Sequence, residues 1–156
     1  MSEILRADLL ERMRHARMDL EGMFRAFDEV DAAKVGVTEK WSVHDLCAHM
    51  VGWQEEFLRQ ADSLAGPFPE KPECDVEEIN AASVKARAGQ PWNQVREAWL
   101  ITLRNIAHHV QGAAPERLEM GQLYRGFLEG IALTHMFEHL GQMNAWMKKL
   151  GIQALD

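Results

Sequence analysis

The chain has 156 residues, of which 47% are hydrophobic and 26% charged, and its formal net charge at pH 7 is −7. This length and composition indicate one globular domain, residues 1–156, with a sizeable buried core. The acidic balance argues against nucleic acid and against an anionic membrane surface as partners, because both require clustered lysine and arginine.

The sequence indicates an intracellular compartment. It has no apolar run of about 18 residues and no basic start followed by an apolar stretch, so we expect neither a membrane-spanning helix nor a signal peptide. The two cysteines, Cys47 and Cys74, belong to no paired-cysteine motif. We therefore expect a cytoplasmic protein whose thiols stay reduced as ordinary buried or surface groups.

The first predicted element is a long amphipathic helix over about residues 2–30. From Leu9 to Val30 its apolar residues recur at alternating steps of four and three, as in helices that pack in a bundle. The charged residues between them, Arg6 among others, are expected to face solvent.

A second helix is predicted from Ser42 to about residue 64. Ser42 and Asp45 stand three residues apart at its start and resemble a capping box, with Asp in place of the commoner Glu. The sequence Gly66-Pro67 then ends the helix.

The remaining pattern is also helical. Residues 75–88 predict a shorter helix, followed by long helices over about 91–110 and 122–150, the last ended by Gly151. Period-two alternation and hairpin turn signals are missing. The sequence therefore predicts an all-α protein, a four-helix bundle with a long irregular or short-helical connection between the second and third main helices.

The last predicted helix carries polar residues where its apolar face should continue. The inward positions of that helix are occupied by His135, His139, Gln142 and Trp146. Residues four apart lie on one helix face, so both imidazole rings can point at one atom. This spacing is typical of helical metal sites.

A metal centre needs at least a third protein ligand, and the second helix offers His49. It lies one turn before Trp53, and nearby Gly52 has no side chain to obstruct access. His49, His135 and His139 are therefore the candidate metal ligands. The alternative interpretation is that they are polar core residues satisfied by protein partners.

Further candidates flank this cluster. Glu138 and Gln142 lie beside the histidines, and Glu56 follows His49 by two turns. These three are candidate catalytic residues, as general base, ligand-orienting group or substrate contact. Trp53 and Trp146 are candidates for binding a cofactor or substrate. For all five, an ordinary core or surface role is the alternative.

Two segments also resemble a known family. Residues 41–50, WSVHDLCAHM, followed by Gly-Trp-Gln at 52–54, resemble the second-helix motif of the DinB/YfiT-like superfamily. Residues 134–142, THMFEHLGQ, resemble its last-helix motif, His-x3-His followed by Gly-Gln. The resemblance implies a four-helix bundle, often a homodimer, with a divalent metal on three histidines. In this chain they are His49, His135 and His139.

The resemblance also implies a chemistry. The superfamily includes S-transferases and isomerases that use bacillithiol, mycothiol or glutathione, and it is associated with zinc or nickel. We therefore expect a small-molecule substrate and a site that activates water or a low-molecular-weight thiol, as an S-transferase or a hydrolase. The alternatives are a non-catalytic bundle that binds small molecules or protects against a toxin, and a structural dimer with a vestigial site.

Overall fold

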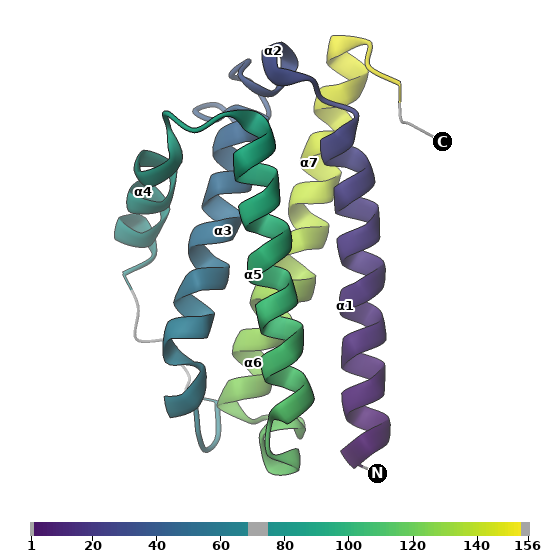
Figure 1. Ribbon diagram of the computed structural model, residues 1–156, viewed down its shortest axis with the longest axis vertical. Coiled ribbons are helices and arrows are strands. Elements are labelled where there is room, and N and C mark those ends of the chain that lie inside the picture. Colours follow the sequence, from purple (N-terminus) through teal and green to yellow (C-terminus); the bar gives the residue numbers. More distant parts are fainter. Residues whose placement is uncertain (1, 69–74, 154–156) are drawn as a thin grey trace.

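Four long helical segments lie side by side in the computed structural model, which describes residues 2–68 and 75–153 and contains no strand in those ranges (Figure 1). The segments are α1 (Ser2–Arg25), α3 (Val43–Gln60), α5 (Trp92–Gly112), and a fourth made of α6 (Leu123–Glu129), the π-helical turn η3 (Gly130–Thr134) and α7 (His135–Leu150). The all-α four-helix bundle expected from the sequence is confirmed.

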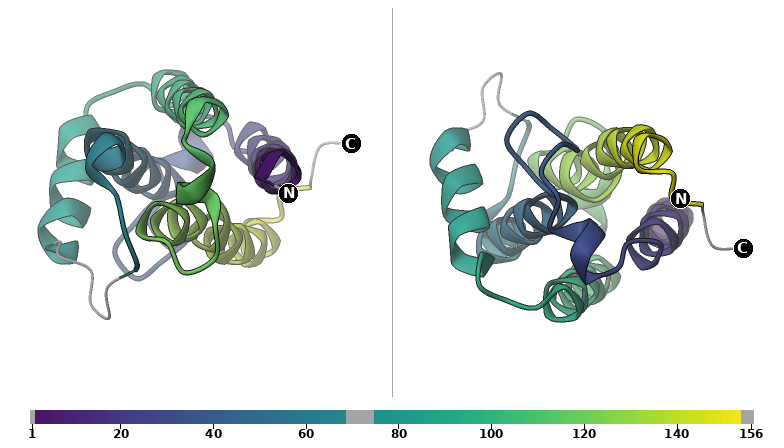
Figure 2. Two further views of the ribbon diagram at one scale, coloured as in Figure 1. Left: turned by 90° about the horizontal axis from the view of Figure 1, so that it is seen from below. Right: turned by 90° about the horizontal axis from the view of Figure 1, so that it is seen from above.

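Shorter elements connect these segments. They are α2 (Glu29–Ala32), η1 (Ala61–Ser63), α4 (Val76–Arg87) and η2 (Pro115–Leu118). α1 and the fourth segment run in one direction, and α3 and α5 run in the other (Figure 1). Because α3 and α5 are parallel, the chain must cross back between them. α4 provides this crossover and packs along the outer side of α3 (Figure 2).

The packing order places the fourth segment next to α3. α3 contacts α5, η3 and α7, while α1 contacts α5, η3 and α7 from the opposite corner (Figure 2). α1 and α3 are therefore diagonal. The interface of α3 with α7, which carries the three candidate histidines, is consequently a direct helix–helix contact.

Local sequence fixes the start of α3 and the end of α7. The Ser42 hydroxyl accepts the Asp45 N–H, and the Asp45 carboxylate accepts the Ser42 N–H, both at 3.1 Å. This reciprocal capping box, as predicted, satisfies two backbone donors that the helix leaves free. Gly151 ends α7 in a left-handed conformation with φ 71°, which glycine adopts without a steric penalty.

The first helix is shorter than predicted. α1 ends at Arg25, and Asp28 caps the separate short helix α2 by accepting the Asp31 N–H at 2.7 Å. Val30, expected in the apolar stripe, is 67% exposed. The apolar pattern of the sequence extends past the end of α1 because Phe27, in the connection that follows, is also buried.

The expectation that Arg6 faces solvent is also wrong. Arg6 is 8% exposed, and its guanidinium donates to the carbonyls of Val110 at 3.2 Å and Ala113 at 2.6 Å. These carbonyls lie at the end of α5, where the regular helical hydrogen bonds run out, although Val110 also accepts the Ala113 N–H at 3.3 Å. A charge at this position also suits the negative end of the helix dipole.

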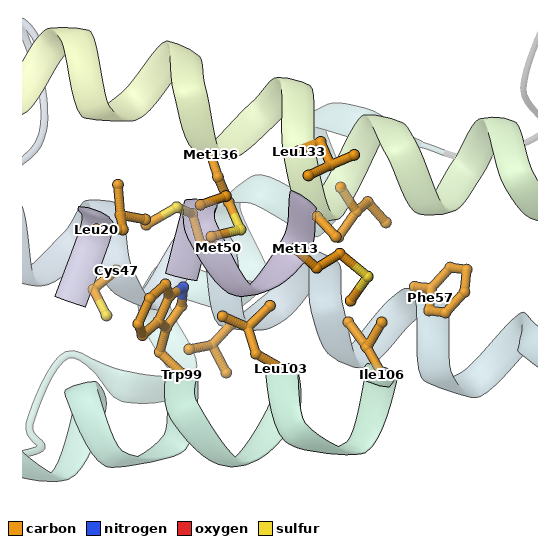
Figure 3. Packing of buried hydrophobic residues seen from close by; sticks show 14 of the residues in the cluster. Met13, Leu20, Cys47, Met50, Phe57, Trp99, Leu103, Ile106, Leu133 and Met136 are labelled. Carbon is orange, nitrogen blue, oxygen red and sulfur yellow. The ribbon is translucent and has the colours of Figure 1, made fainter. Parts of the chain in front are cut away.

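The core is formed by apolar side chains from all four segments. Figure 3 shows the middle of this cluster, with labelled residues Met13, Leu20, Cys47, Met50, Phe57, Trp99, Leu103, Ile106, Leu133 and Met136. Burial raises the pKa of the Cys47 thiol, so Cys47 is an unreactive core residue. Cys74 lies outside the described residues.

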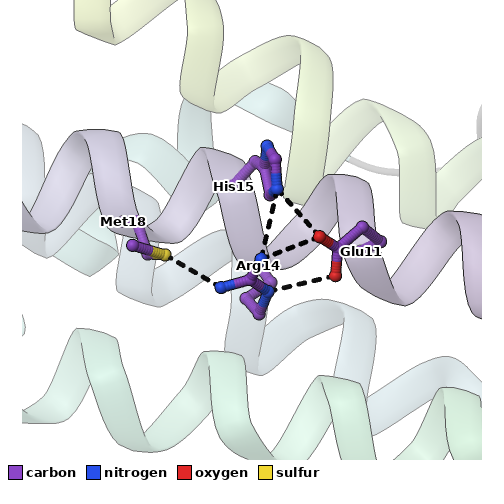
Figure 4. A network of polar contacts seen from close by, with 4 residues as sticks. All are labelled: Glu11, Arg14, His15 and Met18. Atoms are coloured by element: carbon purple, nitrogen blue, oxygen red, sulfur yellow. Dashed lines mark hydrogen bonds and ion pairs between the residues drawn. The ribbon is translucent and has the colours of Figure 1, made fainter.

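The outer face of α1 is charged, as its pattern predicts. Glu11 Oε1 lies 2.7 Å from Arg14 Nη2 and 2.8 Å from His15 Nε2 (Figure 4). Hydrogen bonds from Arg14 and His15 lower the pKa of Glu11 to about 2. These groups are exposed, so solvent screening makes their contribution to the free energy of unfolding small.

α3 and α4 approach most closely at Gly52. A Cβ atom added there would lie 1.7 Å from Ser83 Oγ and 2.3 Å from Ser83 Cβ. Ser83 is buried, and its hydroxyl donates to the Ile79 carbonyl. The absent side chain of Gly52 therefore makes room for α4, and our expectation that it opens access to the histidines is wrong.

We predict that Gly52→Ala destabilises the protein by about 1–3 kcal/mol, because the new methyl group overlaps Ser83 in a close helix contact. Urea unfolding measures the change. Gly22→Ala is the matched control, because Gly22 is also helical and nothing lies within 4 Å of its Cβ position. The control is expected to be neutral or stabilising. Equal stability of the two variants would contradict the close contact.

Candidate metal centre

Three histidines from α3 and α7 meet at the helix interface. His49 belongs to the second turn of α3, and His135 and His139 belong to the first two turns of α7. His135 Nε2 lies 2.8 Å from both His49 Nε2 and His139 Nε2. One ring nitrogen from each residue lies within 4.8 Å of the other two. The structure thus brings together all three predicted ligands.

A π-helical turn sets the direction of these side chains. η3 (Gly130–Thr134) directly precedes His135, and such a turn holds one residue more than an α-helical turn. The buried side chains of α7 are Met136, His139, Met143 and Met147. Relative to the predicted positions 135, 142 and 146, the buried face is shifted by one residue.

This shift corrects the expected face of the last helix. Gln142 is exposed, Trp146 is half-buried, and His135 lies at the edge of the core rather than inside it. His139 alone of the four predicted inward residues is buried. The cluster is therefore closed on its His49 and His139 side and reaches solvent beside His135.

The rings are held in their neutral form. Burial, followed by the nearby His139 ring, lowers the pKa of His49 to about 4. Burial and the two neighbouring rings lower the pKa of His135 to about 3. Burial also lowers the pKa of His139, opposed by Gln142 and Glu138. At neutral pH, the three residues therefore offer lone pairs rather than positive charge.

The donor set fits a transition-metal ion. A ring nitrogen of a neutral imidazole carries either one proton or one lone pair, so His135 Nε2 cannot form a separate hydrogen bond with each neighbour. A cation that accepts one lone pair from each ring satisfies all three. Zinc–nitrogen bonds of about 2.1 Å at tetrahedral angles hold nitrogens about 3.4 Å apart. The two pairs that are 2.8 Å apart would each need to widen by about 0.6 Å.

Gln142 orients one of the rings. Its Oε1 lies 2.6 Å from His139 Nδ1, and because an amide oxygen only accepts, Nδ1 carries the proton. The lone pair of His139 is then on Nε2, facing the cluster. Gln142 thus lies behind a ligand. Glu138 is exposed on the same helix and acts on His139 through its charge.

Glu56 takes no part in the cluster. Its carboxylate accepts from Arg59 Nε at 3.0 Å and also from Gln60. These bonds, chiefly that with Arg59, hold the pKa of Glu56 below its usual value. Among the described residues no carboxylate joins the three histidines. Glu56 is therefore poorly suited to the role of general base.

Trp53 and Trp146, the candidates for binding a cofactor or substrate, are held by contacts outside the histidine cluster. Trp53 Nε1 donates to Asn80 Oδ1 of α4 at 2.7 Å. Trp146 packs against Gly36, where an added Cβ would lie 2.2 Å from the indole ring. Within residues 2–68 and 75–153, neither indole makes a hydrogen bond or a ring–ring contact with the three histidines. Their predicted part in binding a cofactor or substrate stays untested.

Trp41, which the sequence interpretation did not single out, covers His49. The two ring centroids are 4.7 Å apart with an interplanar angle of 42°. The Gly36 N–H donates to the Trp41 carbonyl at 3.0 Å and so folds the connection before α3 back on itself. The sequence signal for this contact is the second-helix motif, in which Trp41 directly precedes the helix cap and His49 follows about two turns later.

The fold and the site define a class: a helical bundle in which two neighbouring helices supply three converging imidazoles. The chain belongs to the DinB family, which its sequence matches over residues 1–155. The resemblance inferred from the two motifs is confirmed. Across the described part of the chain, no helix has the length and hydrophobicity needed to traverse a bilayer.

Two solved structures are similar to this chain. DfsB, described as a sibling lethal factor precursor, shares 13% identity with a TM-score of 0.77, over 95% of this chain and 98% of its own. An uncharacterised protein from Escherichia coli UTI89 shares 13% identity with a TM-score of 0.76, over 95% of each chain. At this identity the likeness shows the fold. No curated protein matches the sequence.

We predict that acid destabilises the metal-free protein through His135. Its folded pKa of about 3 lies below the usual 6.5, so the unfolded chain takes up the proton first as the pH falls. The contribution of His135 is complete above pH 6.5. Between pH 6.5 and 4.5 it decreases by about 2–3 kcal/mol.

Urea unfolding of the chelator-treated protein at pH 7.5, 5.5 and 4.5 measures this loss. The His135→Gln variant cannot take up that proton and should lose less stability over the same range. Carboxylates affect both proteins equally, so the difference between the two curves isolates the histidine. Parallel curves for wild type and variant would contradict the lowered pKa.

Proposed function

We propose that this chain is a metal-dependent enzyme in which His49, His135 and His139 hold one divalent ion. The observation that carries the proposal is the convergence of three neutral ring nitrogens from two helices at the edge of the core. Imidazole ligands suit zinc, nickel, copper and iron. Zinc and nickel are the preferred candidates because of the family resemblance.

When bound, such an ion would supply Lewis acidity, which lowers the pKa of a water or thiol ligand. The protein residues do the rest. Gln142 keeps the proton of His139 on Nδ1, away from the cluster. His49 and His139 are 5% and 8% exposed, so bulk water is excluded on their side. A small substrate approaches beside the half-buried His135.

The proposed reaction is activation of water or of a low-molecular-weight thiol, as in a hydrolase or an S-transferase. Glu138 is exposed and next to His139, and it is the candidate for proton transfer to or from a substrate at the open side. The family resemblance also supports a cytoplasmic homodimer. Sedimentation analysis of the purified chain tests its oligomeric state.

A groove between α1 and α5 favours a second candidate, non-catalytic binding of a small amphiphile. It has a volume of about 420 Å³ and an apolar floor with arginines at its rim; the lining residues are Leu10, Met13, Arg14, Arg17, Leu100, Leu103, Arg104 and Ala107. This volume is typical of small-molecule sites. Thermal stabilisation by a medium-chain carboxylate in metal-free protein would support it.

We predict that purified protein carries close to one divalent metal per chain, measured by elemental analysis. His49→Ala and His135→Ala should each retain less than about a tenth of that metal, because two imidazoles hold a zinc-type ion poorly. His15→Ala is the control, since His15 lies on the exposed face of α1. Circular dichroism shows whether each variant keeps its helices.

Two outcomes would overturn the enzyme proposal at different levels. Wild-type protein that carries no metal and gains no thermal stability from added zinc or nickel would exclude the metal centre. Metal binding without turnover of any tested pair of a thiol and an electrophile, or of any tested ester or amide, would favour the binding-protein alternative.

A further inference from the structure

The crossover helix α4 places a polar group beside the histidine cluster. Asn80 is half-buried on α4, and its Oδ1 accepts the Trp53 N–H at 2.7 Å. An indole nitrogen is only a donor, so this bond fixes which end of the amide faces α3. The amide oxygen, an acceptor, is therefore the atom turned toward this helix.

The outer nitrogen of His49 lacks a partner. His49 Nδ1 is buried and makes no hydrogen bond to any residue in the described ranges. The Asn80 amide is hydrogen-bonded to Trp53, one helical turn after His49. Because His49 and Trp53 are four residues apart on one face of α3, the Asn80 amide lies on the same side of α3 as His49.

We propose that Asn80 is a positioning residue that accepts the Nδ1 proton of His49 and so directs the Nε2 lone pair into the cluster. The proposal rests on the proposed metal centre. An amide oxygen has two lone pairs, so Asn80 Oδ1 can accept from Trp53 and His49 together. Such outer partners of a ligand histidine fix its tautomer and its ring orientation.

The contact between α3 and α4 keeps Asn80 in position. Ser83, one turn after Asn80, fills the space left by Gly52, one residue before Trp53. This close contact opposes sliding of α4 along α3, because Ser83 occupies space that is present only where α3 lacks a side chain. α4 therefore both connects α3 to α5 and completes the support of His49, in the same way that Gln142 supports His139.

Metal affinity tests this role directly. Zinc titrated calorimetrically into metal-free Asn80→Leu should bind about 10–100-fold more weakly than into wild type. Asn80→Asp keeps an acceptor at the same place and should bind within a few-fold of wild type. Asn105→Leu, an exposed asparagine of α5, is the control. Thermal unfolding of each metal-free variant shows that the fold is intact.

A second measurement does not need the metal. Long-range ¹H–¹⁵N spectra of the histidine rings report which nitrogen of His49 is protonated in metal-free protein. The Nδ1–H tautomer should dominate in wild type and in Asn80→Asp, and its share should decrease in Asn80→Leu. If wild type binds no zinc but the Nδ1–H share of His49 still decreases in Asn80→Leu, the metal centre is excluded and the hydrogen bond between Asn80 and His49 is supported.

Two results would overturn the positioning role itself. One is wild-type zinc affinity and an unchanged tautomer in Asn80→Leu. The other is a loss of zinc affinity in Asn80→Asp as large as in Asn80→Leu. Both substitutions would then act through packing, and not through a hydrogen bond accepted from His49.

Discussion

The interface between α3 and α7 depends on imidazole rings that must stay neutral. A ring nitrogen of His135 lies at hydrogen-bond distance from those of His49 and His139, at a place where the neighbouring turns of α7 contribute methionines to the core. Protonating one of these rings would place a positive charge beside the other two rings, where little water is present to solvate it. The surrounding structure reflects this constraint: Trp41 covers one ring, Gln142 binds another, and α4 closes the outer side.

Much of the fold follows from local sequence. The capping pair at the start of α3, Gly151 after α7 and the helical period of the apolar residues all act within a few residues of the chain. Such signals can be read without knowledge of the tertiary structure. The prediction failed where a distant contact decides the outcome. Arg6 is buried because the end of α5, about a hundred residues away, offers it two carbonyl groups.

The three histidines were accessible to prediction for a similar reason. His135 and His139 are neighbours on one helix, His49 was chosen from its position on the second predicted helix, and the resemblance of two motifs gave the same three residues. The supporting residues were less accessible. Trp41 packs against His49 from the connection before α3, and Asn80 lies on the crossover helix α4, where it binds Trp53. Helical spacing does not predict either contact, because each depends on how the chain folds back onto α3. Glu56 has the right spacing from His49, but Arg59 on the same helix binds it.

The π-helical turn η3 lets the fourth segment hold one residue more than a continuous α-helix would. An α-helix turns by about 100° per residue, so without the wider turn the extra residue would rotate every side chain of α7 by that angle relative to α6. His139 would then leave its place against His49, although no ligand had been changed. A one-residue deletion within 130–134 can be absorbed by closing η3 to an α-helical turn, whereas a one-residue deletion between His135 and His139 would separate the two rings from their shared helix face.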